Sequence, residues 1–116
     1  MFREIIEHLN SSEFIYSHEV LEFFDEESIK LIKIKAHLKD GSTLFIRELI
    51  KADGSNYSYH WQDSQGKMLL RWDNAPYHPD VETFPHHCHQ GNKIVSAYRV
   101  AIKEVLDEIA KFVRNG

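Results

Sequence analysis

The chain of 116 residues is long enough for one compact domain and too short for two domains with separate cores. Hydrophobic residues make up 42% and charged residues 28%, which excludes a disordered tail or a collagen-like repeat. No apolar run approaches the roughly 20 residues that a membrane-spanning helix needs. The N-terminal stretch carries acidic residues, unlike a signal peptide, and the single cysteine, Cys88, cannot form an internal disulfide. We therefore expect a cytoplasmic protein with a reduced thiol.

The net charge of −4 is unevenly distributed along the chain. Residues 1–27 hold eight acidic residues and one basic residue, Arg3, so the remainder is mildly basic. Phosphate repels net negative charge, so we expect the whole chain to be a poor non-specific nucleic-acid binder, although its basic part can contact phosphates locally. The acidic residues are typical of a solvated helix and edge strand. Alternatively, the acidic segment covers a basic face until a partner removes it.

The N-terminal segment, residues 1–28, predicts a short helix followed by an ambiguous stretch. Apolar residues at helical spacing begin at Phe2, and the helix is expected to end near Asn10 and Ser11. Residues 14–24 fit either a strand or a helical turn. Their aromatic and β-branched side chains favour a strand at the edge of a sheet.

Residues 29–73 predict an antiparallel meander. Apolar and polar side chains alternate over residues 32–38, 43–50, 57–62 and 68–72, as they do on half-buried strands. Turn signals separate these stretches at Asp40-Gly41, Asp53-Gly54 and Gln65-Gly66. The sequence therefore predicts a single α+β domain with a sheet of four strands, or five if residues 14–24 join it.

Residues 74–92 hold all three prolines and little periodicity, so they predict a long loop. Five of the eight histidines fall between positions 60 and 89, and side chains that titrate near neutrality rarely cluster by chance. Residues 93–114 repeat apolar residues every three or four positions and predict a long helix packed on the sheet. Asn92 is the expected cap of that helix.

A predicted hairpin between residues 57–63 and 67–73 brings polar side chains to one face. With a two-residue loop, His60 and Arg71 are neighbours on adjacent strands, and Asp73 shares their face. The histidine-rich loop follows the Arg71 strand and can fold back over it. The opposite, core face then carries Tyr57, Tyr59, Trp61, Met68, Leu70 and Trp72.

These polar residues suit a metal-independent ribonuclease, for which no cofactor is expected. One histidine would deprotonate the ribose 2′-hydroxyl, another would protonate the leaving oxygen, and an arginine would stabilise the phosphorane. Arg71 is assigned to the phosphate, His60 and one of His86, His87 or His89 to the acid–base pair, and Asp73 and Asn74 to their orientation. The predicted catalytic residues are His60, Arg71, Asp73, Asn74, His86, His87 and His89. Alternatively, Arg71 only pairs with Asp73 or Glu48, and His60 caps a loop carbonyl.

A metal site is the second interpretation of the histidines. The loop spacings allow chelation, and His78, His86 and His89 are the candidate ligands of a structural zinc ion. The chain would then be a non-enzymatic binding module. A nucleophilic Cys88 is a further alternative, but no third residue that would orient it is apparent nearby.

Four blocks of the sequence resemble the signature of the TumE family. They are residues 59–63 (YHWQD), 71–76 (RWDNAP), 78–79 (HP) and 83–89 (TFPHHCH). One departure is Tyr77, which stands where the family pattern has histidine directly after the proline. The resemblance, over roughly residues 29–110, implies the toxin of a type II toxin–antitoxin pair with a helix-turn-helix antitoxin as its partner. RNA is the substrate that the residue chemistry suggests. A homodimer is compatible with the toxin role and with RNA cleavage.

Overall fold

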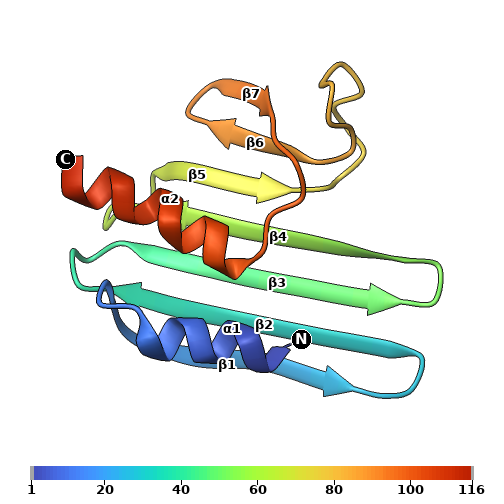
Figure 1. Cartoon of the computed structure of the whole chain (residues 1–116), viewed down its shortest axis with the longest axis horizontal. Coiled ribbons are helices and arrows are strands. Elements are labelled where there is room, and N and C mark those ends of the chain that lie inside the picture. The colour runs from blue at the N-terminus through green and yellow to red at the C-terminus, as the bar shows by residue number, and fades with distance from the viewer. Residues whose placement is uncertain (1, 116) are drawn as a thin grey trace.

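The computed structural model describes residues 2–115, which form two helices and a seven-stranded antiparallel sheet (Figure 1). The chain begins with α1 (Phe2–Ser11) and ends with α2 (Ile102–Asn115). Between them lie β1 (Ile15–Asp25), β2 (Ile29–Leu38), β3 (Thr43–Lys51), β4 (Gly54–Gln62), β5 (Met68–Asp73), β6 (His87–Gln90) and β7 (Lys93–Ser96). Each strand pairs with the next one in chain order, so the sheet is a meander. The predicted α+β class is confirmed, but the predicted number of four to five strands is too small.

The N-terminal elements follow their sequence patterns. Helix α1 ends at Ser11, and residues 15–25 form the edge strand β1, as the β-branched and aromatic side chains favoured. The turn between β2 and β3 is tight because Gly41 adopts a φ of 88°, which is unfavourable for residues with a side chain.

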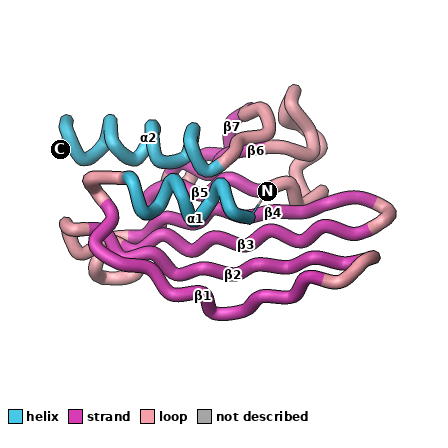
Figure 2. The backbone as a smooth tube through the Cα atoms, turned by 60° about the horizontal axis from the view of Figure 1, so that its bottom comes forward, coloured by secondary structure: helices cyan, strands magenta, loops and turns pink. Residues whose placement is uncertain are grey.

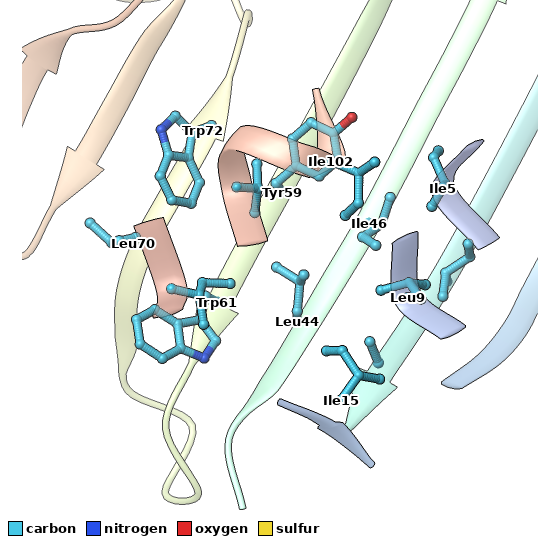
Figure 3. Packing of buried hydrophobic residues seen from close by; sticks show 14 of the residues in the cluster. Ile5, Leu9, Ile15, Leu44, Ile46, Tyr59, Trp61, Leu70, Trp72 and Ile102 are labelled. Carbon is cyan, nitrogen blue, oxygen red and sulfur yellow. The ribbon is translucent and has the colours of Figure 1, made fainter. Parts of the chain in front are cut away.

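Both helices pack on one face of the sheet and bury the core between the two layers (Figures 2 and 3). The helices contribute Ile5, Leu9, Ile102, Val105 and Ile109. The sheet contributes aliphatic residues from β2 and β3 and the aromatic residues Tyr57, Tyr59, Trp61 and Trp72. Each such side chain stabilises the fold by about 1.5–3 kcal/mol when it is fully buried. The aromatic residues of β4 and β5 are therefore core residues, as predicted.

The segment 74–92 is not wholly a loop, as it was predicted to be. Its last residues form β6, which pairs with β5, and Gly91, with a φ of 63°, turns the chain into β7. The prolines that favoured a loop end at Pro85. Beyond the prolines, the backbone N–H and C=O groups at the edge of β5 need hydrogen-bond partners, and the residues of β6 supply them. These residues form a strand although their own sequence shows little strand pattern.

Helix α2 begins at Ile102 rather than at residue 93. Ile94 and Tyr98 fit the helical spacing, yet their side chains are 38% and 82% exposed and contribute nothing to the buried core. Pairing with β6 holds residues 93–96 in a strand instead. Asn92 is therefore not the helix cap; the Glu104 carboxylate accepts the Ala101 N–H at 3.1 Å and caps the helix there.

The acidic helix α1 does not cover the sheet face that carries His60 and Arg71. Its buried residues Ile5 and Leu9 belong to the core between the helices and the opposite sheet face. The proposal that the N-terminal residues mask a basic face is therefore wrong for α1. In the described part of the chain, neither helix combines the length and apolar character that crossing a membrane requires.

Candidate functional site

The sheet surface opposite the two helices, which we call the open face, carries the candidate site. His60 of β4, Arg71 of β5 and His89 of β6 lie directly opposite one another on three adjacent strands. The predicted proximity of His60 and Arg71 is confirmed. The turn between β4 and β5 is longer than the predicted one, and a β-bulge between Trp61 and Gln62 accommodates the difference. As a result Met68 pairs with Gln62 and is absent from the core face on which it was predicted.

Arg71 links His60 to Asp73. Its Nη1 lies 3.2 Å from Nδ1 of His60, and its Nε donates to Oδ2 of Asp73 at 2.9 Å. Because arginine only donates, His60 Nδ1 must accept, and Nε2 is left to donate to Oε1 of Gln62 at 3.1 Å. Burial, and then the nearby Arg71 charge, hold the pKa of His60 below its ordinary value of 6.5. His60 is therefore a neutral imidazole at neutral pH.

Asp73 is the buried anion at the centre of the site. Besides Arg71, its carboxylate accepts the backbone N–H of Ala75 at 3.0 Å. Its two oxygens lie 3.0 Å from Nε2 of His87 and 3.5 Å from Nε2 of His89. Asp73 thus contacts both the arginine and two of the loop histidines.

Three histidines, His78, His87 and His89, form a cluster beside Asp73, which we call the histidine cluster. One nitrogen of each ring lies within 4.8 Å of those of the other two. His87 is almost fully buried, whereas His78 and His89 are half-buried. Burial lowers the pKa of His89, and the Asp73 charge opposes this shift.

His86 lies apart from the histidine cluster. Its Nδ1 is 2.8 Å from the Tyr57 hydroxyl and its ring stacks on that of Tyr57, a residue of the buried core. Of the predicted metal ligands His78, His86 and His89, the structure therefore brings together His78 and His89, with His87 beside them, and places His86 elsewhere. Side chains alternate along a strand, so His87 and His89 share the open face while Cys88 points into the core.

Asn74, which was predicted to help orient the acid–base pair, bonds to backbone groups. Its Oδ1 accepts the N–H of Tyr57 at 3.0 Å, and its Nδ2 donates to the Ser55 carbonyl at 3.0 Å. These bonds satisfy backbone groups at the beginning of β4. Asn74 thus fixes the end of the sheet, and its amide makes no hydrogen bond to His60 or Arg71 in the described residues.

Two alternatives from the sequence are decided by burial and pairing. Arg71 pairs with Asp73 and not with Glu48. The buried Glu48 carboxylate lies 3.9 Å from the Arg99 guanidinium, and burial raises the pKa of Glu48. Cys88 is 2% exposed, and burial raises its pKa to about 11. Its thiol is therefore protonated at neutral pH, which argues against a nucleophilic role.

A groove on the open face, which sequence reasoning missed, leads to His60 and Arg71. Its volume is about 330 Å³. It is lined by Leu21, Lys33, Ile34, Phe45, Ile46, Arg47, Ser58, His60 and Arg71. The Phe45 ring lies 6.3 Å from that of His60, with the Lys35 ammonium 5.8 Å from its centroid. In the sequence, basic and aromatic residues alternate with apolar residues along β2 and β3. The sequence alone does not show which face of the sheet the helices cover, so it does not show that these residues line a groove on the uncovered face.

The fold and the site together define a small α+β protein with a histidine- and arginine-rich site on one uncovered sheet face. A family model described as Toxin TumE matches residues 3–115, so the chain belongs to the TumE toxin family. No curated protein and no solved structure matches the chain. Membership of a toxin family implies, in general, an antitoxin partner.

Proposed function

We propose that this toxin cleaves RNA at the open face by acid–base chemistry in which no metal ion takes part. The observation that supports this proposal is the row formed by His60, Arg71 and His89 on adjacent strands. Strands lie about 4.8 Å apart, so the two histidines flank the arginine at roughly 10 Å from each other. A phosphodiester bound to Arg71 would have one imidazole on each side.

The hydrogen bonds of His60 suggest how it would be activated. In the free protein, Arg71 donates to the lone pair on Nδ1 of His60. A substrate phosphate would draw the guanidinium N–H groups to its own oxygens in a bidentate pair. The freed lone pair of His60 would then accept the proton of the ribose 2′-hydroxyl.

The bond changes follow from these positions. The 2′-oxygen attacks phosphorus, and the bond from phosphorus to the 5′-oxygen breaks. His89, in its protonated form, gives its proton to the leaving 5′-oxygen. Burial lowers the pKa of His89, and the Asp73 carboxylate beside it opposes this shift. Arg71 stabilises the charge that develops on the phosphorane oxygens. The products are a 2′,3′-cyclic phosphate and a free 5′-hydroxyl.

The groove supports single-stranded RNA as the substrate. Lys33, Arg47 and Arg71 line it, and the Phe45 ring lies beside His60 at its end. Basic side chains that follow a backbone, together with an aromatic ring on which a base stacks, are typical of single-strand binding. DNA lacks the 2′-hydroxyl nucleophile, so it would bind without being cleaved.

The test is cleavage of a labelled single-stranded RNA in the presence of a chelator. We expect His60→Ala and Arg71→Ala to lower kcat/KM by about 10²–10⁴. His37→Ala is the matched control, because His37 lies on the same sheet face but bonds only to Glu19 in the described structure. It should retain wild-type activity. An RNA with a single 2′-deoxy position should be spared at that position. Wild-type rates in both His60→Ala and Arg71→Ala would rule out the mechanism.

The family resemblance adds a partner to this proposal. A helix-turn-helix antitoxin encoded beside the toxin would bind it in the cytoplasm, where its RNA substrate is found. Co-expression should restore growth and allow the two chains to be purified together. Size-exclusion chromatography of the free toxin would show whether it is a homodimer.

A further inference from the structure

One contact in the histidine cluster joins two hydrogen-bond acceptors if His87 is neutral. Nδ1 of His87 lies 2.9 Å from the Pro85 carbonyl oxygen, and a carbonyl oxygen only accepts, so Nδ1 carries the proton. In a neutral ring, Nε2 of His87 is then a lone pair. This lone pair lies 3.0 Å from Oδ1 of Asp73, which is also an acceptor.

Only a cation can make this contact favourable. A lone pair and a carboxylate oxygen repel each other at this distance, and His87 is 1% exposed, so water cannot separate them readily. The cation is either a second proton on His87 or a metal ion that both groups bind. Nε2 of His89 lies 3.1 Å from the same nitrogen of His87 and adds a third ligand atom.

The spacing of the ligand atoms suits a metal ion. Zinc binds imidazole nitrogens and carboxylate oxygens at about 2.0–2.1 Å, which places neighbouring tetrahedral ligand atoms about 3.3 Å apart. The distances of 3.0 and 3.1 Å around Nε2 of His87 are close to that value. The third histidine of the cluster, His78, has a ring nitrogen within 4.8 Å of those of His87 and His89 and would move closer to them to complete the set.

The hydrogen bonds that hold the proposed ligands are of the kind found around metal sites. A metal-bound histidine usually donates its other ring N–H to a carbonyl or a carboxylate, which fixes the ring and makes it more basic. His87 does so through Pro85. The Asp73 carboxylate is held in turn by Arg71 and by the backbone N–H of Ala75. Both positions are therefore fixed before an ion binds.

We propose that His78, His87 and His89, together with Asp73, bind one divalent transition-metal ion, with zinc as the chemical type. The site goes beyond the proposed cleavage, in which no metal takes part. An ion there would occupy the lone pair of His89 and remove the imidazole on that side of Arg71. This consequence rests on the proposed cleavage: zinc would hold the toxin in an inactive form, so one equivalent of Zn²⁺ should lower the rate of RNA cleavage.

Metal binding is tested without RNA. Untagged protein is stripped with a chelator, and Zn²⁺ is titrated by calorimetry, with Co²⁺ as a visible-absorption probe of tetrahedral geometry. We expect one equivalent to bind and the thermal midpoint to rise with zinc concentration. His78→Ala and His89→Ala, at half-buried positions, should weaken binding at least tenfold while circular dichroism shows a folded chain.

His86→Ala is the matched control, because His86 belongs to the same segment but stacks on Tyr57. It should bind zinc as the wild type does. Absence of binding by the wild type, or unchanged binding in a His78→Ala/His89→Ala double variant, would overturn the metal site. Neither result bears on RNA cleavage. Conversely, zinc that binds and accelerates cleavage would retain the site and contradict the metal-independent mechanism.

Discussion

Arg71 is the residue on which the candidate site depends most. It is the hydrogen-bond neighbour of His60 on one side and of Asp73 on the other. Its permanent positive charge pairs with the Asp73 carboxylate and, after burial, lowers the pKa of His60. The row from His60 to His89 can therefore hold a proton acceptor and a proton donor a short distance apart.

The pKa of His60 should respond to this charge. Burial lowers it most and Arg71 lowers it further, while Gln62 opposes the shift by hydrogen bonding. Arg71→Gln removes the charge and should raise the pKa of His60 towards 6.5, although burial still holds it below that value. The acidic limb of kcat/KM against pH in the wild type should accordingly lie below pH 6.5.

An NMR titration of the imidazole Cε1–H resonances measures this pKa, with His60→Ala to assign the signal. In the described part of the chain, His60 contacts Arg71, Gln62 and the Phe45 ring, and Arg71 is the charged group that lowers its pKa. A pKa for His60 that falls or stays constant in Arg71→Gln would contradict the assigned cause.

Helix α2 is the element that holds β4 and β5 in place from behind. Ile102, Val105 and Ile109 pack against the aromatic residues of those strands, as Figure 3 shows for Ile102 near Tyr59. The site on the open face therefore depends on a helix that packs on the opposite side of the sheet. A substitution in the buried side of α2 should therefore lower the stability of the fold without removing a side chain of the site.

Ile109→Ala should lower the free energy of unfolding by about 2–5 kcal/mol, because it leaves a cavity at a position that is 1% exposed. Urea denaturation followed by tryptophan fluorescence measures the change. Lys111→Ala, on the exposed side of the same helix, is the control and should remain within about 0.5 kcal/mol of wild type. Equal stabilities for the two variants would contradict the packing described.

The elements that could be predicted from the sequence are those with a local cause. Alternating side chains and glycine turns specify β2 to β5 within a single stretch of chain. Strands β6 and β7 depend on the edge of β5, a tertiary feature that no local pattern records. The same limit explains His86 and His87: a shift of one residue in the strand reverses which of them reaches the open face.

At the scale of the whole molecule, charge is divided between the two sides of the sheet. Lys33 and Arg47 line the groove on the open face, while the acidic helix α1 lies on the other side. Strand β1 brings acidic residues to the open face: Glu22 lies 3.2 Å from Lys33, which lines the groove, and Glu19 lies 2.8 Å from His37. The edge strand thus neutralises part of the surface proposed to bind RNA.

Removal of these two charges should strengthen RNA binding. We expect Glu19→Gln/Glu22→Gln to lower the Kd for single-stranded RNA about threefold at low salt, with a smaller effect at 0.5 M salt because of screening. Fluorescence anisotropy measures the Kd. Glu4→Gln/Glu7→Gln changes the net charge equally on α1 and should have less effect. Equal gains in both variants would show that only net charge matters.

The order of the strands has a consequence for how the chain folds. Every strand pairs with its neighbour in sequence, so each step of sheet formation closes a short loop at a small entropic cost. Low contact order of this kind favours rapid folding compared with sheets that join distant strands. The sheet can grow as successive hairpins from β1 towards β7. His60, Arg71 and His89 lie on three consecutive strands, so the row is complete only when β6 docks, near the end of that sequence.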